Sequence, residues 1–192
     1  MSALQAELRA AAASLDRRTF LRLAGVAAAT GIMPSGCGGV PEGLAPRPDV
    51  TLAVLSPRTY AVFTAAAMRI VGPRGAELIA DRRVDVGGLA DAWLVAAPSV
   101  AGPLGQALLV LEFGVWPVIG KVRPFTSVPP GAQDGVLAEC MTSRLDLKRS
   151  LFRGVRSLAL LTFYGSPATR SLTGYPGPFG TGSVTIADAM KD

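Results

Sequence analysis

The side chains that most often carry out chemistry are scarce in this chain of 192 residues. It has no histidine and only two cysteines, Cys37 and Cys140. Catalysis by serine–histidine or cysteine–histidine pairs is therefore excluded, as are histidine-ligated metals and haem. Two cysteines are too few for a zinc or iron–sulfur site, which needs about four ligands. Asp81, Asp85 and Asp91 lack the spacing of a metal-binding loop, so we interpret them as surface charges.

Cofactor-binding motifs are also missing. The chain has no glycine-rich dinucleotide fingerprint, no phosphate-binding loop and no haem attachment motif. The sequence therefore predicts no catalytic residue, no bound cofactor and no metal in this chain. A hydrolase that uses Ser, Asp and Lys without histidine remains a minor alternative.

The composition indicates an all-α fold of small size. The chain is 49% hydrophobic and 17% charged, which is typical of a folded protein and not of a disordered one. Its 22 glycines and 15 prolines favour a small, irregular helical domain with Gly/Pro-rich loops and an extended C-terminal segment. The net charge of +5 is too dispersed for a nucleic-acid binder.

Residues 1–36 have the layout of a bacterial export signal. Arg17 and Arg18, followed by Phe20 and Leu21, match the twin-arginine pattern, and the apolar run Leu23–Met33 comes next. The run is far shorter than the roughly 20 residues of a membrane-spanning helix. We therefore expect recognition by the twin-arginine translocase and a final location in the periplasm or on the outer face of the cytoplasmic membrane. A plain amphipathic helix is the alternative.

The end of this segment leaves the fate of Cys37 open. Ser35-Gly36-Cys37 resembles the end of a lipobox, although Pro34 stands where Leu is usual. Cys37 is thus a candidate lipidation site, which would hold the protein at a membrane surface; ordinary cleavage nearby is the alternative. If Cys37 is lipidated or cleaved off, Cys140 is left unpaired; we interpret Cys140 as a small buried residue, with an intersubunit disulfide as the minor alternative. Residues 37–50 are predicted to form a flexible tether.

Five helices are expected in a domain that covers residues 51–180, with a tail at 181–192. They run from Ser56-Pro57 to Gly72, from Val84 to Ala97, from Pro103 onward, over 131–143, and from about 145 to 164. The third contains Glu112, so we expect a buried core helix and no membrane span. The fourth is expected to turn Val136, Leu137, Cys140 and Met141 inward.

The last helix has two distinct faces. At 100° per residue the apolar face is formed by Leu147, Leu151, Val155, Leu158 and Thr162. Arg149, Arg153 and Arg156 share another face, and beyond Arg156 the helix is apolar all round, so it must be buried in its own domain or under a partner. The candidate partner interface consists of Arg149, Arg153, Arg156, Leu160, Phe163, Tyr164 and Tyr175. A solvated arginine face and core packing of the tyrosines are the alternatives.

The C-terminal half carries a set of motifs in a familiar order. These are Phe125-Thr126, Ser143-Arg144 with Arg149, Phe152-Arg153, Phe163-Tyr164 and Gly174-Tyr175-Pro176-Gly177-Pro178. In this order and spacing the chain resembles the gluconate 2-dehydrogenase subunit 3 family. The resemblance covers roughly residues 51–180 and is most specific over 125–178.

The resemblance implies a function that the residues alone do not. It implies a helical small subunit without catalytic residues, bound to a large FAD-bearing dehydrogenase subunit of the glucose–methanol–choline type. A multihaem cytochrome c often accompanies such pairs, whose large subunit oxidises sugars, sugar acids, alcohols or sterols. The alternative is an envelope lipoprotein with a structural or interaction role and no redox partner.

Overall fold

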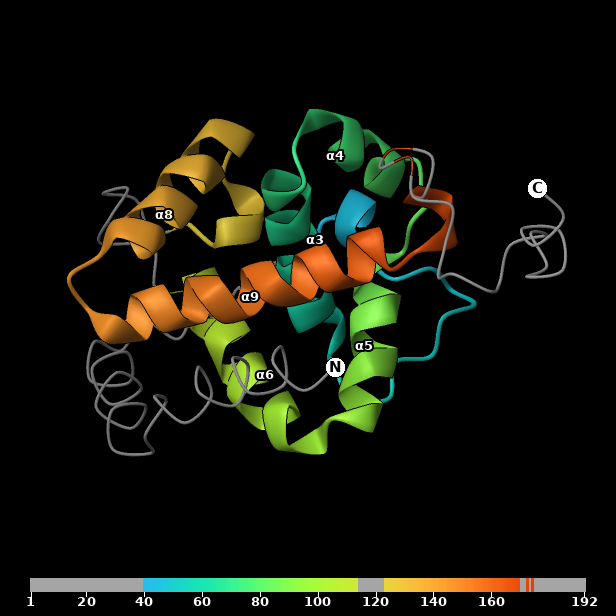
Figure 1. Ribbon diagram of the computed structural model, residues 1–192, viewed down its shortest axis with the longest axis horizontal. Helices are drawn as coiled ribbons and strands as arrows, with labels where there is room; N and C mark the ends of the chain where they lie inside the picture. Colours follow the sequence, from blue (N-terminus) through green and yellow to red (C-terminus); the bar gives the residue numbers. More distant parts are fainter. Residues whose placement is uncertain (1–39, 114–122, 170–171, 173, 175–192) are drawn as a thin grey trace, which may run out of the picture.

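The computed structural model describes residues 40–113, 123–169, 172 and 174, and within them the fold is all-α without strands (Figure 1). The predicted fold class is thus confirmed. Three short 3-10 turns, η1 to η3, accompany the α-helices. The α-helices are α3 (Pro57–Ile70), α4 (Pro73–Ala80), α5 (Val86–Ala96), α6 (Pro98–Phe113), α8 (Pro130–Thr142) and α9 (Asp146–Tyr164).

Helix α3 is the centre of the domain. Ser56 caps its first turn by accepting a hydrogen bond from the Thr59 N–H, and Pro57 occupies the first helical position, as predicted. Its residues from Thr59 to Ala67 are all buried. In Figure 1 α3 lies behind α9, with the other helices arranged around it.

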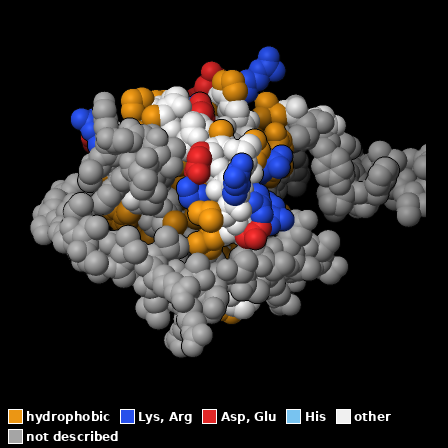
Figure 2. Space-filling model, turned by 90° about the vertical axis from the view of Figure 1, so that its left-hand side faces the viewer, with side chains coloured by type: hydrophobic (Ala, Val, Ile, Leu, Met, Phe, Trp, Pro, Cys, Tyr) orange, Lys and Arg blue, Asp and Glu red, His pale blue; other side chains and the backbone are white. Residues whose placement is uncertain are grey.

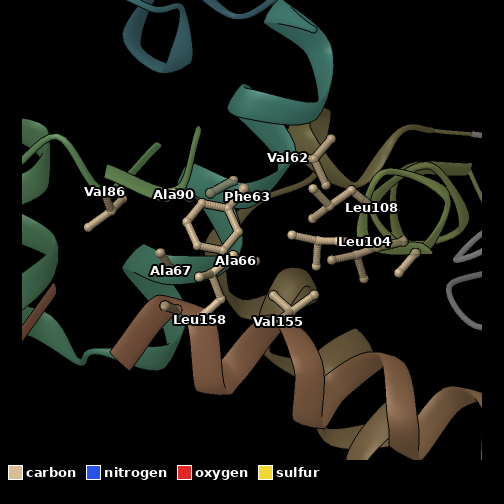
Figure 3. Packing of buried hydrophobic residues seen from close by; sticks show 14 of the residues in the cluster. Val62, Phe63, Ala66, Ala67, Val86, Ala90, Leu104, Leu108, Val155 and Leu158 are labelled. Carbon is tan, nitrogen blue, oxygen red and sulfur yellow. The ribbon is translucent and has the colours of Figure 1, made fainter. Parts of the chain in front are cut away.

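The core is built from alanines and a few larger residues of α3 and from branched residues of its neighbours. In Figure 3 the Phe63 ring lies among Ala66, Ala90 and Leu158, which come from α3, α5 and α9. Val62 points from α3 toward the leucines of α6 in the same view. The alanines allow close helix approach, and each fully buried aromatic or aliphatic side chain stabilises the fold by about 1.5–3 kcal/mol.

Two positions in this part of the fold require glycine, one for a turn and one for a close approach. Gly72 joins α3 to α4 with a φ of 80°, a conformation that favours glycine. Gly87 lies against the Tyr60 ring, and a Cβ at this position would come within 2.3 Å of a ring carbon. Any larger residue at position 87 would therefore push α5 away from α3.

The helix predictions were wrong in two places: one boundary was misplaced and one short helix was missed. Helix α6 begins at Pro98 and not at Pro103, which lies inside the helix. Pro98 does end α5, but its fixed φ also suits a first helical turn, so the next helix starts without a loop. Helix α4 was not predicted, since its eight residues are too few to show a clear period. No α-helix within the described residues is long and apolar enough to cross a membrane.

Two further differences concern which residues are buried. Met141 was expected to point inward, but its side chain is 52% exposed. The buried face of α8 is centred on Gln133, Val136 and Cys140, which places Met141 at its margin. The predicted tether at 37–50 includes the turn η1 (Glu42–Leu44), and Leu44 packs against the core. From residue 40 onward this segment is therefore part of the folded domain.

Candidate functional site

The sequence-predicted interface residues lie mainly on the outward side of α9. Arg149, Arg153, Arg156, Leu160 and Tyr164 follow one another at spacings of four and three, opposite the buried side of the helix. We call these five residues the α9 outer stripe. Figure 1 shows α9 running across the front of the molecule. The stripe thus combines three guanidinium groups with an apolar end.

The three arginines differ in their contacts. Arg149 forms an ion pair with Asp146 and also donates to the Ser143 carbonyl. Among the described residues, Arg153 makes one hydrogen bond, a long one of 3.4 Å to the Ser150 hydroxyl. Within the described part of the chain Arg156 is exposed and makes no hydrogen bond or ion pair. The stripe therefore keeps donors that could meet carboxylates, which an arginine fork binds in pairs.

One predicted interface residue is not on the surface. The Phe163 side chain is only 1% exposed and belongs to the core, so it is not available to a partner. Its ring meets the Tyr164 ring edge to face at 5.1 Å, and Tyr164 is 47% exposed. The core therefore holds Tyr164 in place at the end of the stripe. Core packing, the alternative given for the tyrosines, does not hold for Tyr164; the residue that packs in the core is Phe163.

The remaining predicted site residues lie outside the described residues. They are Arg17, Arg18, Phe20 and Leu21 of the export signal, the candidate lipidation site Cys37, and Tyr175 of the candidate interface. The extended C-terminal segment also lies largely outside them.

Charged side chains gather where α8 joins α9. Figure 2 shows Lys and Arg side chains on this face, with Asp and Glu among them and apolar side chains beside them. Lys148 reaches both carboxylate oxygens of Glu139, at 2.8 and 3.0 Å, and so ties α9 to α8. Leu145, just before α9, is exposed. This face is mixed in charge and partly apolar.

A small hollow lies between α3, η1 and the turn before α5. The Tyr60 hydroxyl donates to Asp85 at 2.6 Å, and burial together with this bond raises the pKa of Tyr60, so the phenol stays protonated. The buried hydroxyl of Thr64 lines the hollow without a protein partner within the described residues. The cavity has about 20 Å³, which is room for one water molecule.

Asp91 was predicted to be a surface charge, and this was wrong. Its side chain is 5% exposed and accepts hydrogen bonds from three successive backbone N–H groups, those of residues 53, 54 and 55, at 2.8, 2.9 and 2.6 Å. Burial acts to raise the pKa of Asp91, but the three N–H donors hold it below its usual value. Asp85 likewise caps α5 through the Gly88 N–H. Both carboxylates are structural groups.

Glu112 is a second buried carboxylate, with an exposed fraction of 0%. It accepts hydrogen bonds from the N–H and the hydroxyl of Thr126, at 3.0 and 2.8 Å, and from Arg58 at 3.1 Å. It therefore connects α6 to α3 and to the turn η2 (Phe125–Ser127). The sequence indicated that this helix belongs to a core, but not which groups satisfy the charge.

Cys140 lies on the buried side of α8, as expected. Burial, with a smaller contribution from Glu139, raises the pKa of the Cys140 thiol to about 11. In the described ranges no cluster of three or more Cys, Asp or Glu side chains is placed to hold a metal ion.

Comparison with protein-family models, with curated proteins and with solved structures finds no match to this chain. The family resemblance therefore rests on its sequence motifs. Sequence reasoning missed the roles of Asp91 and Glu112, and the only signal for them was that each is an isolated charge within an apolar helix.

Proposed function

We propose that this chain is a non-catalytic small subunit that binds, stabilises and co-exports a flavin-dependent dehydrogenase of the glucose–methanol–choline type. The large subunit would hold FAD and act on sugars, alcohols or sterols, and a cytochrome c subunit could complete the complex. The motifs between residues 125 and 178 carry this proposal, because their order and spacing resemble those of the gluconate 2-dehydrogenase subunit 3 family.

The α9 outer stripe gives structural support to the proposal, in addition to the sequence motifs. Phe152-Arg153 and Phe163-Tyr164, two of the quoted motifs, both lie on α9. In each motif the first ring faces inward or is half-buried, and the second residue is exposed on the stripe. The motifs thus combine one residue that fixes the helix with one that a partner could contact. Tyrosine and arginine are the residue types enriched in protein interfaces.

Export tests the proposal directly. Replacing both Arg17→Lys and Arg18→Lys keeps the charge but removes the planar, five-donor guanidinium fork. We expect this chain, its flavin-bearing partner and the dehydrogenase activity all to stay in the cytoplasm. The measurement is the amount of each in periplasmic and cytoplasmic fractions. The matched control is the double replacement Arg9→Lys and Arg22→Lys, which should leave export unchanged.

Two outcomes would contradict the proposal. If this chain stays inside while the flavin-bearing protein still reaches the periplasm, the chain is not an escort. If the exported chain purifies as a colourless single species without flavin absorbance, the envelope lipoprotein without a redox partner is the better interpretation.

A further inference from the structure

Helices α5 and α6 expose no charged side chain. Between Val86 and Phe113 the chain has only two charged residues, Asp91 and Glu112, and both are buried and hydrogen-bonded. The outward side chains are apolar, small or uncharged. We call the most prominent of them the α5–α6 face: Leu89, Ala92, Trp93, Val95, Leu109 and Val110.

This arrangement is unusual for helices that face water. A surface helix normally places charged residues opposite its apolar stripe. The outward side of α5 instead has Leu89 and Val95 exposed at 41% and 56%. The centre of a protein interface is depleted of charged residues in the same way, and large exposed apolar patches mark such surfaces. The α5–α6 face therefore has the composition of a surface that a binding partner covers.

The α5–α6 face alone is too small for a stable interface, so a neighbouring surface must contribute area. At 1.5 Å per residue, α5 and α6 are about 16 and 24 Å long, and two such helices side by side cover about 400 Å². A stable interface needs about 800 Å² on each partner. Helix α9 packs against both α5 and α6, and Figure 1 shows it directly above them. The α9 outer stripe is thus the neighbouring surface that could complete the area.

We propose that the α5–α6 face, with the α9 outer stripe along its border, is the docking surface for the flavin-bearing large subunit. This inference rests on the proposed function. It implies that the large subunit offers an apolar face with acidic groups at its edge, opposite Arg153 and Arg156.

Charge selects this occupant over a second copy of the chain. In a symmetric dimer a second copy would present the same arginines, so both sides of the interface would be positive and would repel. A lipid surface is usually bound through basic residues beside the apolar ones, which the α9 outer stripe would also provide, so binding to lipid vesicles is kept as an outcome of the test. A protein partner with acidic groups at its edge would cover the apolar α5–α6 face and also pair with the arginines of the α9 outer stripe.

A charge placed on this face should abolish docking. Val95→Arg puts an unpaired charge on this face, where Val95 is 56% exposed, and Met141→Arg is the matched control, because Met141 on α8 is similarly exposed, at 52%. With the large subunit co-expressed, we expect flavin absorbance to co-elute with the tagged wild-type chain and with Met141→Arg. Val95→Arg should weaken this association more than about tenfold, since a buried unpaired charge is strongly unfavourable. Circular dichroism checks that each variant is folded.

A second measurement does not depend on a disruptive variant. In a Cys37→Ser background, Ala96→Cys places a thiol on α5 and Ala138→Cys a control thiol on α8; both positions are exposed. The native Cys140 is buried and does not interfere. In the flavin-bearing complex, maleimide labelling at position 96 should be blocked while labelling at 138 continues.

The outcomes separate the two proposals. If no flavin co-elutes with the wild-type chain, the proposed function fails and the docking surface with it. If flavin co-elutes equally with Val95→Arg, or position 96 stays reactive in the complex, the docking surface alone fails. Protection of position 96 without flavin, together with a doubled mass in sedimentation or with flotation on lipid vesicles, would overturn the inference in favour of a second copy or a membrane.

Discussion

The helix pairs α5–α6 and α8–α9 place their charges in opposite ways. In α8–α9 the charged groups lie outside, as in the Glu139–Lys148 and Asp146–Arg149 pairs, and the inside is uncharged. In α5–α6 the two charged groups, Asp91 and Glu112, lie inside and the outside is uncharged. The first pair follows the usual rule for a helix in water, and the second reverses it.

The difference shows that the contribution of a charged side chain to stability depends on its burial and on the groups that it is paired with. A buried carboxylate must be matched by donors, because an unsatisfied one is strongly destabilising. Asp91 has three backbone N–H donors, and Glu112 has Thr126 and Arg58. The outer pairs of α8–α9 are partly solvated, and such ion pairs contribute about 0–1 kcal/mol. The two pairs of helices should therefore respond very differently to loss of a charge.

The largest effect is expected at Asp91. Asp91→Ala leaves three backbone N–H groups without an acceptor, and we expect the free energy of unfolding to fall by about 3 kcal/mol or more. Urea denaturation of the mature chain, or of its complex if the chain alone aggregates, measures the change. The control is Glu139→Gln, which should cost less than about 1 kcal/mol. Equal losses in the two variants would remove the distinction between the helix pairs.

A smaller effect is expected from pH. The pKa of Asp91 in the folded protein is below its usual value of about 3.9, so its carboxylate stabilises the fold at neutral pH. This contribution is lost as the pH falls through the folded pKa. Asp91→Asn should therefore be less stable than wild type at pH 7, and the difference should shrink below about pH 4. The pKa of Asp134 is also lowered, by Arg69, but this group is the same in both proteins.

A difference in unfolding free energy that is independent of pH between 7 and 3 would contradict the role of the Asp91 charge. It would indicate that the shape of the side chain, and not its ionised form, holds residues 53–55.

The smallest effect is expected on the inner side of α8. With a pKa of about 11, the thiol of Cys140 has roughly a hundredfold less thiolate than an ordinary cysteine. In a Cys37→Ser background, iodoacetamide at pH 8 should label the folded chain slowly and the urea-unfolded chain quickly. Cys140→Ala should change stability by only about 1 kcal/mol. Rapid labelling of the folded chain would show that this side of α8 opens readily to solvent.

Local signals were enough to predict much of the fold. Ser56-Pro57 marks the start of α3 because the cap and the fixed φ act within one turn. Likewise Leu151, Val155 and Leu158 identified the buried side of α9, since helical period alone determines which residues share a face. The all-α class followed from such segments.

Long-range partners could not be predicted in the same way. Asp91 was interpreted as a surface charge because its donors lie 36 to 38 residues earlier and nothing in the local pattern connects them. Phe163 was placed on an interface because the helix is apolar all round there, and sequence alone does not say which of those residues the rest of the chain covers. Met141 was wrongly predicted to be buried because it lies at the margin of the buried face of α8. Whether a residue at such a margin is buried or exposed depends on its neighbours in the fold.

The Asp91 contact also has a consequence for the order of events during synthesis. Asp91 is added to the chain 36 residues after Leu55, its partner. At about 5–20 residues per second, this is a delay of roughly 2 to 7 seconds. During that time the three N–H groups of residues 53–55 can donate only to water and not to the Asp91 carboxylate. The ribosome must therefore reach Asp91 in α5 before residues 53–55 can form these hydrogen bonds, so the predicted leader is synthesised well before the domain can complete its fold.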